Sequence, residues 1–160
     1  MKSNLAYLEL KVPPLALLGF FGTLMWIFAQ WCPGVTLHFP FQGQLALVLM
    51  ALGLFIILAG VQAFKVAQTT VNPLQPSTSS HLVTHGVYQH TRNPMYVGMA
   101  LIVAAWFVAL GNILNLAFLS AFVVCIHNLQ ILPEERILKE GFGKEYLEYM
   151  ERVPLSLIHI

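Results

Sequence analysis

Long stretches of this chain are hydrophobic and contain no charged side chain. The first stretch covers residues 12–64 and the second covers 93–133. A membrane-spanning helix needs about 20 apolar residues, so each stretch has room for two spans and a turn. Prolines, glycines and polar residues interrupt the first stretch between residues 31 and 43, and Gly111-Asn112 interrupts the second. The pattern therefore predicts about four transmembrane helices, near residues 14–30, 44–64, 94–110 and 113–132.

The amino-acid composition leads to the same class of protein. Of 160 residues, 58% are hydrophobic and 9% are charged, whereas soluble domains carry about 25% charged residues. This excludes a soluble enzyme, and a net charge of +1 without a basic stripe excludes a nucleic-acid binder. Cys32 and Cys125 are too few for a disulfide framework or a zinc site. We predict an all-α, polytopic membrane helical bundle with an amphipathic C-terminal helical tail, forming a single domain over residues 1–160.

The basic residues predict the orientation of the bundle. They precede the first span, lie in the connection 65–93 or follow the fourth span, and the connections 31–43 and 111–112 contain none. By the positive-inside rule, both termini, the connection 65–93 and the tail 133–160 are expected to be cytoplasmic. No small-x-small cleavage site follows the first apolar stretch, so we expect that span to be an uncleaved helix in the membrane.

The connection 65–93 is much longer than the usual links of about 2–8 residues between bundle helices. Its first half, 66–80, is polar and rich in turn residues, as in a linker or a lid. Its second half, 81–93, mixes apolar and aromatic residues. We expect the second half to be ordered and docked against the bundle.

The tail 133–160 contains every acidic residue except Glu9. Pro133 suits the first turn of a helix, where the helix dipole favours acidic side chains such as Glu134 and Glu135. Glycines near residue 142 are expected to divide the tail into two short helices. Glu134 and Glu135 may be no more than helix caps at the membrane surface, and this interpretation stands beside a functional one.

The predicted topology brings the second half of the connection, the start of the third span and the start of the tail to one membrane boundary. A helix N-terminus offers unpaired N–H groups to an anion, and a pair of carboxylates suits a cation. A ligand that carries both charges and an apolar part fits this boundary.

Four blocks of sequence at this boundary form a specific pattern through their order and the distances between them. They are Leu82-Val83-Thr84-x-Gly86-Val87-Tyr88, Arg92-Asn93-Pro94-Met95-Tyr96-Val97-Gly98, Glu134-Glu135, and Phe142-Gly143-Lys144-Glu145-Tyr146-Leu147-Glu148-Tyr149 followed by Arg152-Val153-Pro154. The pattern resembles the isoprenylcysteine carboxyl methyltransferases, their prokaryotic relatives and, more distantly, the phospholipid methyltransferases. The resemblance covers residues 80–154, whereas residues 1–79 share only hydrophobic spans with these proteins.

The resemblance implies an integral membrane methyltransferase that uses S-adenosylmethionine as cofactor and acts on a lipid-like or small hydrophobic acceptor. It implies a cofactor site formed by Leu82, Val83, Tyr88, Asn93, Pro94, Tyr96, Glu134 and Glu135. Arg92 and His127 are weaker candidates for contact with the substrate. No metal and no nucleic acid are expected to take part.

The chain departs from the family's pattern in two places. Asn93 stands where the family most often has histidine, and an asparagine side chain does not take up a proton, so no acid–base role is expected there. Residues 126–132 lack an arginine that some eukaryotic members carry and that is associated with the substrate. The second departure counts against a prenylcysteine carboxylate as acceptor. Without a dedicated base, we expect catalysis by proximity and desolvation, with the acceptor entering laterally between spans.

Three histidines and one arginine have competing interpretations. His127 lies inside the fourth predicted span, where a polar residue is a functional candidate by default, although it may only pack and form a hydrogen bond. Arg92 may only anchor the membrane boundary. His81 and His85 have the spacing of metal ligands, but they lie in a loop without acidic residues or cysteines nearby, and no metal site is predicted.

Other functions are compatible with a four-helix membrane protein. A small transporter usually keeps an acidic residue inside a span, and none lies between Val12 and Pro133. A non-enzymatic bundle that holds haem needs paired histidines at one depth in different spans, and only His127 lies clearly within a span. A family member that binds the cofactor without turnover is a further alternative.

Overall fold

The computed structural model describes residues 7–67 and 82–155. In these ranges it contains the helices α1 (Pro14–Trp31), α2 (Gln42–Val66), α3 (Pro94–Leu110), α4 (Asn115–Ile126), α5 (Leu132–Phe142) and α6 (Lys144–Arg152), with the 3₁₀ turns η2 (Pro33–Val35) and η4 (Gly86–Gln89) and the π-helical segment η5 (His127–Ile131). This is the predicted all-α membrane bundle. Most of the predicted linker 66–80, and His81, lie outside the described residues.

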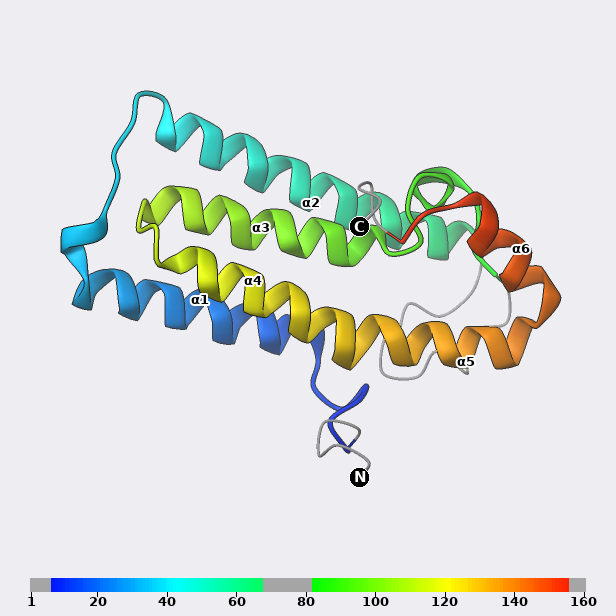
Figure 1. The fold of residues 1–160 in the computed structure, drawn as a ribbon. Coiled ribbons are helices and arrows are strands. Elements are labelled where there is room, and N and C mark those ends of the chain that lie inside the picture. Colours follow the sequence, from blue (N-terminus) through cyan, green and yellow to red (C-terminus); the bar gives the residue numbers. More distant parts are fainter. Residues whose placement is uncertain (1–6, 68–81, 156–160) are drawn as a thin grey trace.

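The long helices lie side by side in the order α2, α3, α4 and α1 (Figure 1). Three helical segments, α1, α2 and Asn115–Phe142, are long and apolar enough to cross a membrane, and α3 is shorter at 17 residues. The helices agree with the four predicted spans to within a few residues. Lipid offers no partner for backbone N–H and C=O groups, so hydrophobic length alone predicts where helices form.

One prediction about the tail is wrong. Pro133 does not start a separate helix, because the residue before α5 already has helical backbone angles, and α4, η5 and α5 form one rod. Pro133 has no N–H to donate to the carbonyl of Leu129, and that carbonyl instead accepts a hydrogen bond from the backbone N–H of Leu10, at 2.9 Å. Glu134 and Glu135 therefore lie within a continuous helix and do not cap a free N-terminus. The predicted division of the tail occurs at Gly143, between α5 and α6.

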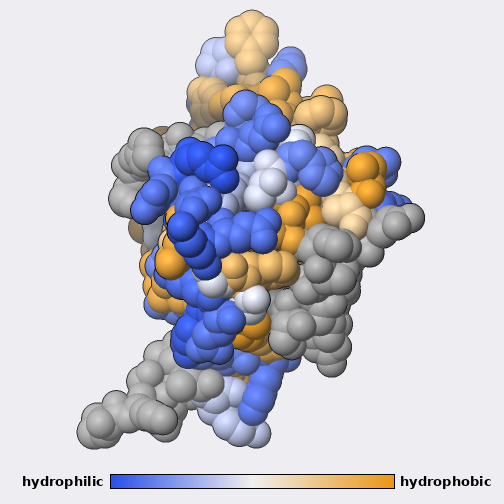
Figure 2. All heavy atoms as spheres, turned by 90° about the vertical axis from the view of Figure 1, so that its right-hand side faces the viewer, coloured by the Kyte–Doolittle hydropathy of each residue, from blue (hydrophilic) through white to orange (hydrophobic). Residues whose placement is uncertain are grey.

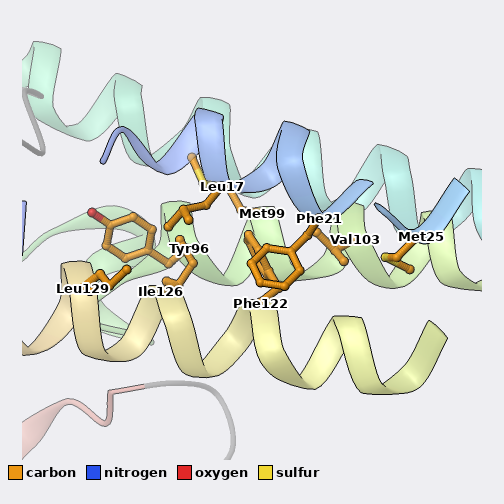
Figure 3. Packing of buried hydrophobic residues seen from close by; sticks show 9 residues of the cluster. All are labelled: Leu17, Phe21, Met25, Tyr96, Met99, Val103, Phe122, Ile126 and Leu129. Atoms are coloured by element: carbon orange, nitrogen blue, oxygen red, sulfur yellow. The ribbon is translucent and has the colours of Figure 1, made fainter. Parts of the chain in front are cut away.

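The core lies between α1, α3 and α4. Its buried side chains are Leu17, Phe21, Met25, Tyr96, Met99, Val103, Phe122, Ile126 and Leu129 (Figure 3). The rings of Phe21 and Phe122 meet edge to face, with centroids 5.8 Å apart. Because lipid tails are as apolar as these residues, close packing and interhelical hydrogen bonds hold such a bundle together.

Hydrogen bonds from polar side chains join the helices. Asn115 Nδ2 donates to the carbonyl of Met25 on α1 at 3.1 Å, and Gln130 Nε2 donates to the carbonyl of Val12 at 2.8 Å. Trp106 Nε1 on α3 donates to the carbonyl of Gly22 on α1 at 3.0 Å. These bonds fix α1 against α3 and against the rod formed by α4, η5 and α5.

The segment 82–93 and α6 pack together at one end of the bundle, which we call the site end (Figure 1). The Tyr149 hydroxyl donates to the carbonyl of Tyr88 at 2.7 Å. The Arg92 N–H and the Thr91 hydroxyl donate to the carbonyls of Pro154 and Leu155, at 3.1 and 2.9 Å. The prediction that residues 82–93 are ordered and docked is confirmed for that range.

Hydrophilic residues gather at the site end, as Figure 2 shows in a view onto it. Arg136 on α5 forms an ion pair with Glu9, at 3.2 Å, so the segment before α1 also lies at this end. The opposite end, around residues 32–41 and 111–114, contains no charged residue. The structure thus has the charge asymmetry from which the orientation was predicted.

Candidate functional site

The first turn of α3 and the first turn of α5 meet at the site end. The buried Tyr96 hydroxyl donates a hydrogen bond to Oε1 of Glu134. Figure 3 shows the Tyr96 ring beside Leu17, Ile126 and Leu129, with its hydroxyl directed out of the apolar core. Two sequence blocks that are far apart in the chain are therefore in direct contact at the site end.

The neighbouring glutamate has a different partner. Glu135 Oε1 lies 3.1 Å from Nη1 of Arg92, and the two side chains are 10% and 11% exposed. The two groups are not aligned for a hydrogen bond, so this contact is an ion pair. Successive residues of an α-helix point about 100° apart, which is why Glu134 faces Tyr96 while Glu135 faces Arg92.

Two buried donors near these pairs have no partner among the described residues. They are Nε of Arg92 and Nδ2 of Asn93. Buried polar groups in proteins are nearly always hydrogen-bonded, and a group without a partner requires an explanation. A bound molecule with acceptor atoms would satisfy both donors. The site thus presents unsatisfied donors beside a carboxylate, an arrangement that complements a ligand carrying both charges.

A cavity of about 390 Å³ lies between α3 and the α4–η5 rod, next to this site. Tyr96 on α3 and Asn93, the residue before α3, line it on one side, and His127 and Asn128 line it from η5. Most of the remaining lining is apolar and includes Val123 and Val124, which are exposed on the outer surface of α4. The cavity therefore reaches the surface of the bundle that faces lipid.

Of the eight predicted cofactor residues, only Asn93 and Tyr96 line this cavity. Val83 and Tyr88 pack with Ala63 of α2 in one apolar cluster, and Leu82 packs against a second cluster formed by Tyr146, Tyr149 and Val153. Pro94 is fully buried in the first turn of α3. These four residues therefore pack in the interior at the site end, outside the cavity lining.

Tyr146 and Tyr149 were not among the predicted site residues. Burial raises the pKa of both hydroxyls, and that of Tyr88, so all three remain neutral donors. Tyr146, Tyr149 and Val153 recur at intervals of three and four residues, which is the spacing of one helix face. That spacing was the available signal that α6 docks on a partner. No pattern in the sequence pointed to Leu155, which also lines the cavity.

Comparison with known proteins identifies the family. A model of the phospholipid methyltransferase family matches residues 41–145. Protein-S-isoprenylcysteine O-methyltransferase B of Arabidopsis thaliana is 42% identical over 74 residues, which are 46% of this chain and 37% of that protein. The Schizosaccharomyces pombe protein-S-isoprenylcysteine O-methyltransferase is 33% identical over 76 residues, 48% of this chain and 32% of that protein.

A longer match is to protein-S-isoprenylcysteine O-methyltransferase A of Arabidopsis thaliana, 32% identical over 122 residues, which are 76% of this chain and 61% of that protein. The chain thus spans between about a third and three fifths of the length of these relatives. No solved structure matches the chain significantly. Because the family model covers well over half of its residues, the chain belongs to the phospholipid methyltransferase family.

Proposed function

We propose that this integral membrane protein is an S-adenosylmethionine-dependent methyltransferase, similar to the isoprenylcysteine carboxyl methyltransferases, with a lipid-like or small hydrophobic acceptor. The observation that carries the proposal is the Tyr96–Glu134 hydrogen bond, because it joins two family blocks beside unsatisfied donors and a cavity that reaches lipid. Membership of the family supports an enzyme over a transport-type or non-enzymatic bundle.

The charges of the site fit the proposed cofactor. Nε of Arg92 and Nδ2 of Asn93 would bind its carboxylate, and Glu134 would face its ammonium or sulfonium. The aromatic faces of Tyr88 and Tyr96 favour a cation by about 0.5–2 kcal/mol. When bound, the cofactor supplies an electrophilic methyl group.

The remaining predicted site residues would act as support. Leu82, Val83 and Pro94 would provide the apolar wall of the cofactor site. Glu135 would act through Arg92, because their ion pair fixes the guanidinium beside Asn93.

The cavity beside Tyr96 would hold the acceptor. Its exposed valines lie on the lipid-facing surface of α4, so an apolar molecule would enter between α3 and α4 without crossing water. A dry, apolar site favours a reaction that disperses charge. Alignment of the acceptor with the methyl group would supply much of the remaining rate.

The proposal includes an orientation and a domain assignment. The basic residues favour placing both termini and the site end on the cytoplasmic side, where the water-soluble cofactor would enter. The four spans, the connection and the tail would form one methyltransferase domain.

Equilibrium binding of labelled S-adenosylmethionine to the detergent-purified protein tests the proposal. We expect saturable binding that weakens by about tenfold or more in Glu134→Gln, since a hydrogen bond or contact with a charged group contributes about 1.5–3 kcal/mol. Glu148→Gln on the exposed face of α6 is the matched control and should bind like the parent protein. Incubation with membrane extract would then reveal which fraction accepts the labelled methyl group. A protein without saturable binding would refute the proposal.

A further inference from the structure

The polar groups of the cavity between α3 and η5 are unusual for a site that receives an anion. Among the described lining residues, Asn93, Tyr96, His127 and Asn128 carry the hydrogen-bonding groups, and none is a lysine or an arginine. Arg92 precedes Asn93 but is not part of the lining, and it is paired with Glu135. A carboxylate in this cavity would find no cationic side chain among the described lining residues, and a buried charge without a partner is costly.

His127 differs from the other polar groups of the lining because its ring is free. It is the first residue of the π-helical segment η5 and is partly buried. Tyr96 is bound to Glu134, and Nδ2 of Asn128 donates to the carbonyl of Val124 at 2.8 Å. The His127 ring forms no hydrogen bond with any residue in the described part of the chain. Histidine is the side chain that most often acts as a general base in enzymes, and π-helical turns frequently occur at functional sites.

We propose that this cavity receives a neutral acceptor with a proton on its nucleophilic atom, namely a long-chain thiol, and that a ring nitrogen of His127 takes that proton. The inference rests on the proposed methyltransferase function and deepens it. It names the acceptor class and gives the chain the base that its sequence did not reveal.

The atoms and charges of the step balance. The lone pair of the acceptor's sulfur forms a bond to the methyl carbon, the bond from that carbon to the donor sulfur breaks, and its electron pair stays on the donor sulfur. The acceptor's proton passes to His127. The positive charge of the sulfonium is thereby replaced by that of an imidazolium, which can release its proton to water at the boundary.

The variant His127→Gln provides the main test, because glutamine keeps a hydrogen-bonding side chain but takes no proton. The probe acceptors are 1-dodecanethiol and N-acetyl-S-farnesylcysteine, which carries a carboxylate. We expect the thiol to receive label faster than the carboxylate. We expect His127→Gln to slow that transfer by about 10²–10⁴-fold at pH 7, which is the usual range for a general base.

The pH profile separates a base from a packing residue. The loss in His127→Gln should shrink at pH 9–10 with the thiol, since the thiol then ionises by itself. The other titratable group of the described lining is Tyr96, which donates a hydrogen bond to Glu134. The Arg92–Glu135 ion pair joins the same two elements. All four residues are unchanged in the variant. His38→Gln, at the opposite end of the bundle, is the matched control and should keep the parent rates.

A second measurement does not depend on turnover. Diethyl pyrocarbonate modifies free imidazoles, and mass spectrometry reports the rate at His127. Dodecanethiol should slow this modification severalfold, and N-acetyl-S-farnesylcysteine should not. Faster labelling of the carboxylate, unchanged rates in His127→Gln, or absence of protection would each overturn the inference. Absence of S-adenosylmethionine binding would instead refute the proposed function, so the two failures are distinguishable.

Discussion

Arg92 and Glu135 form a nearly buried ion pair that ties the segment before α3 to the first turn of α5, with Nη1 and Oε1 3.1 Å apart. The pair holds two elements that also meet through Tyr96 and Glu134. Its burial makes it a test of whether the site end is a rigid unit, because removal of one partner leaves the other charge unpaired.

Glu135→Gln should therefore destabilise the protein. Loss of one partner from a buried ion pair costs about 3–5 kcal/mol, so we expect a clear fall in the midpoint of thermal unfolding in detergent. The double variant Arg92→Gln/Glu135→Gln should lose less stability than the sum of the two single variants, since no unpaired charge remains.

An exposed ion pair provides the control for this prediction. Arg136 and Glu9 are 3.2 Å apart, but their side chains are 59% and 27% exposed, and exposed pairs contribute about 0–1 kcal/mol. Arg136→Gln should change the unfolding midpoint little. If it destabilises the protein as much as Glu135→Gln does, burial is not the reason for the effect.

Tyr96→Phe should weaken binding of S-adenosylmethionine less than Tyr96→Ala does. Phenylalanine keeps the aromatic face and fills the core position, but it removes the hydroxyl that orients Glu134. Tyr96→Ala removes both and leaves a cavity among Leu17, Ile126 and Leu129. Dissociation constants from equilibrium binding, compared with unfolding midpoints, separate the loss of orientation from the loss of packing. Equal binding by all three proteins would contradict the assignment of this residue.

Asn93→His should be tolerated, and Asn93→Leu should not. The histidine ring keeps a donor for the acceptor atom that we place opposite Nδ2, which has no partner among the described residues. Leucine removes every donor at that position, and binding should weaken by about tenfold, the equivalent of 1.4 kcal/mol. The measurement is the dissociation constant of S-adenosylmethionine. Failure of Asn93→His to bind would mean that Asn93 has a different role.

The sequence predicted the helices well because membrane spans are determined by local composition. It did not predict that α5 continues α4, because the compensation for Pro133 comes from a distant residue. The carbonyl of Leu129, which a helical N–H at position 133 would satisfy, is bound by the N–H of Leu10. No local pattern contains that partner.

The candidate site was only partly predictable, because its geometry also depends on contacts between segments that are distant in the chain. The positions of the charged residues and the lengths of the spans predicted that Tyr96 and Glu134 lie at one membrane boundary. Which glutamate faces Tyr96 and which faces Arg92 depends on the rotation of α5 about its axis. That rotation is fixed by packing in three dimensions. The same packing places Leu82, Val83 and Tyr88 in apolar clusters and brings His127 to the cavity beside Tyr96.

Gly98 and Gly53 make the close contact between α3 and α2, and a methyl group at either position should disrupt it. A Cβ on Gly98 would lie 2.6 Å from the carbonyl oxygen of Gly53, and a Cβ on Gly53 would lie 2.7 Å from that of Gly98. Both obstacles are backbone atoms, so the helices themselves must move apart. Overpacking of this kind costs about 1–3 kcal/mol, and Gly98→Ala should lower the unfolding midpoint in detergent.

Gly19→Ala on α1 is the matched control, because a Cβ there meets no atom within 4 Å. It should leave the midpoint unchanged or raise it slightly, since alanine is the better helix former. Both variants replace glycine by alanine inside a helix, so they change helix propensity alike. A difference in their unfolding midpoints therefore reports the steric contact at Gly98. Because α3 also carries Tyr96, separation of α2 from α3 should weaken cofactor binding in Gly98→Ala as well. A Gly98→Ala protein as stable as Gly19→Ala would show that α2 and α3 do not approach as closely as this structure places them.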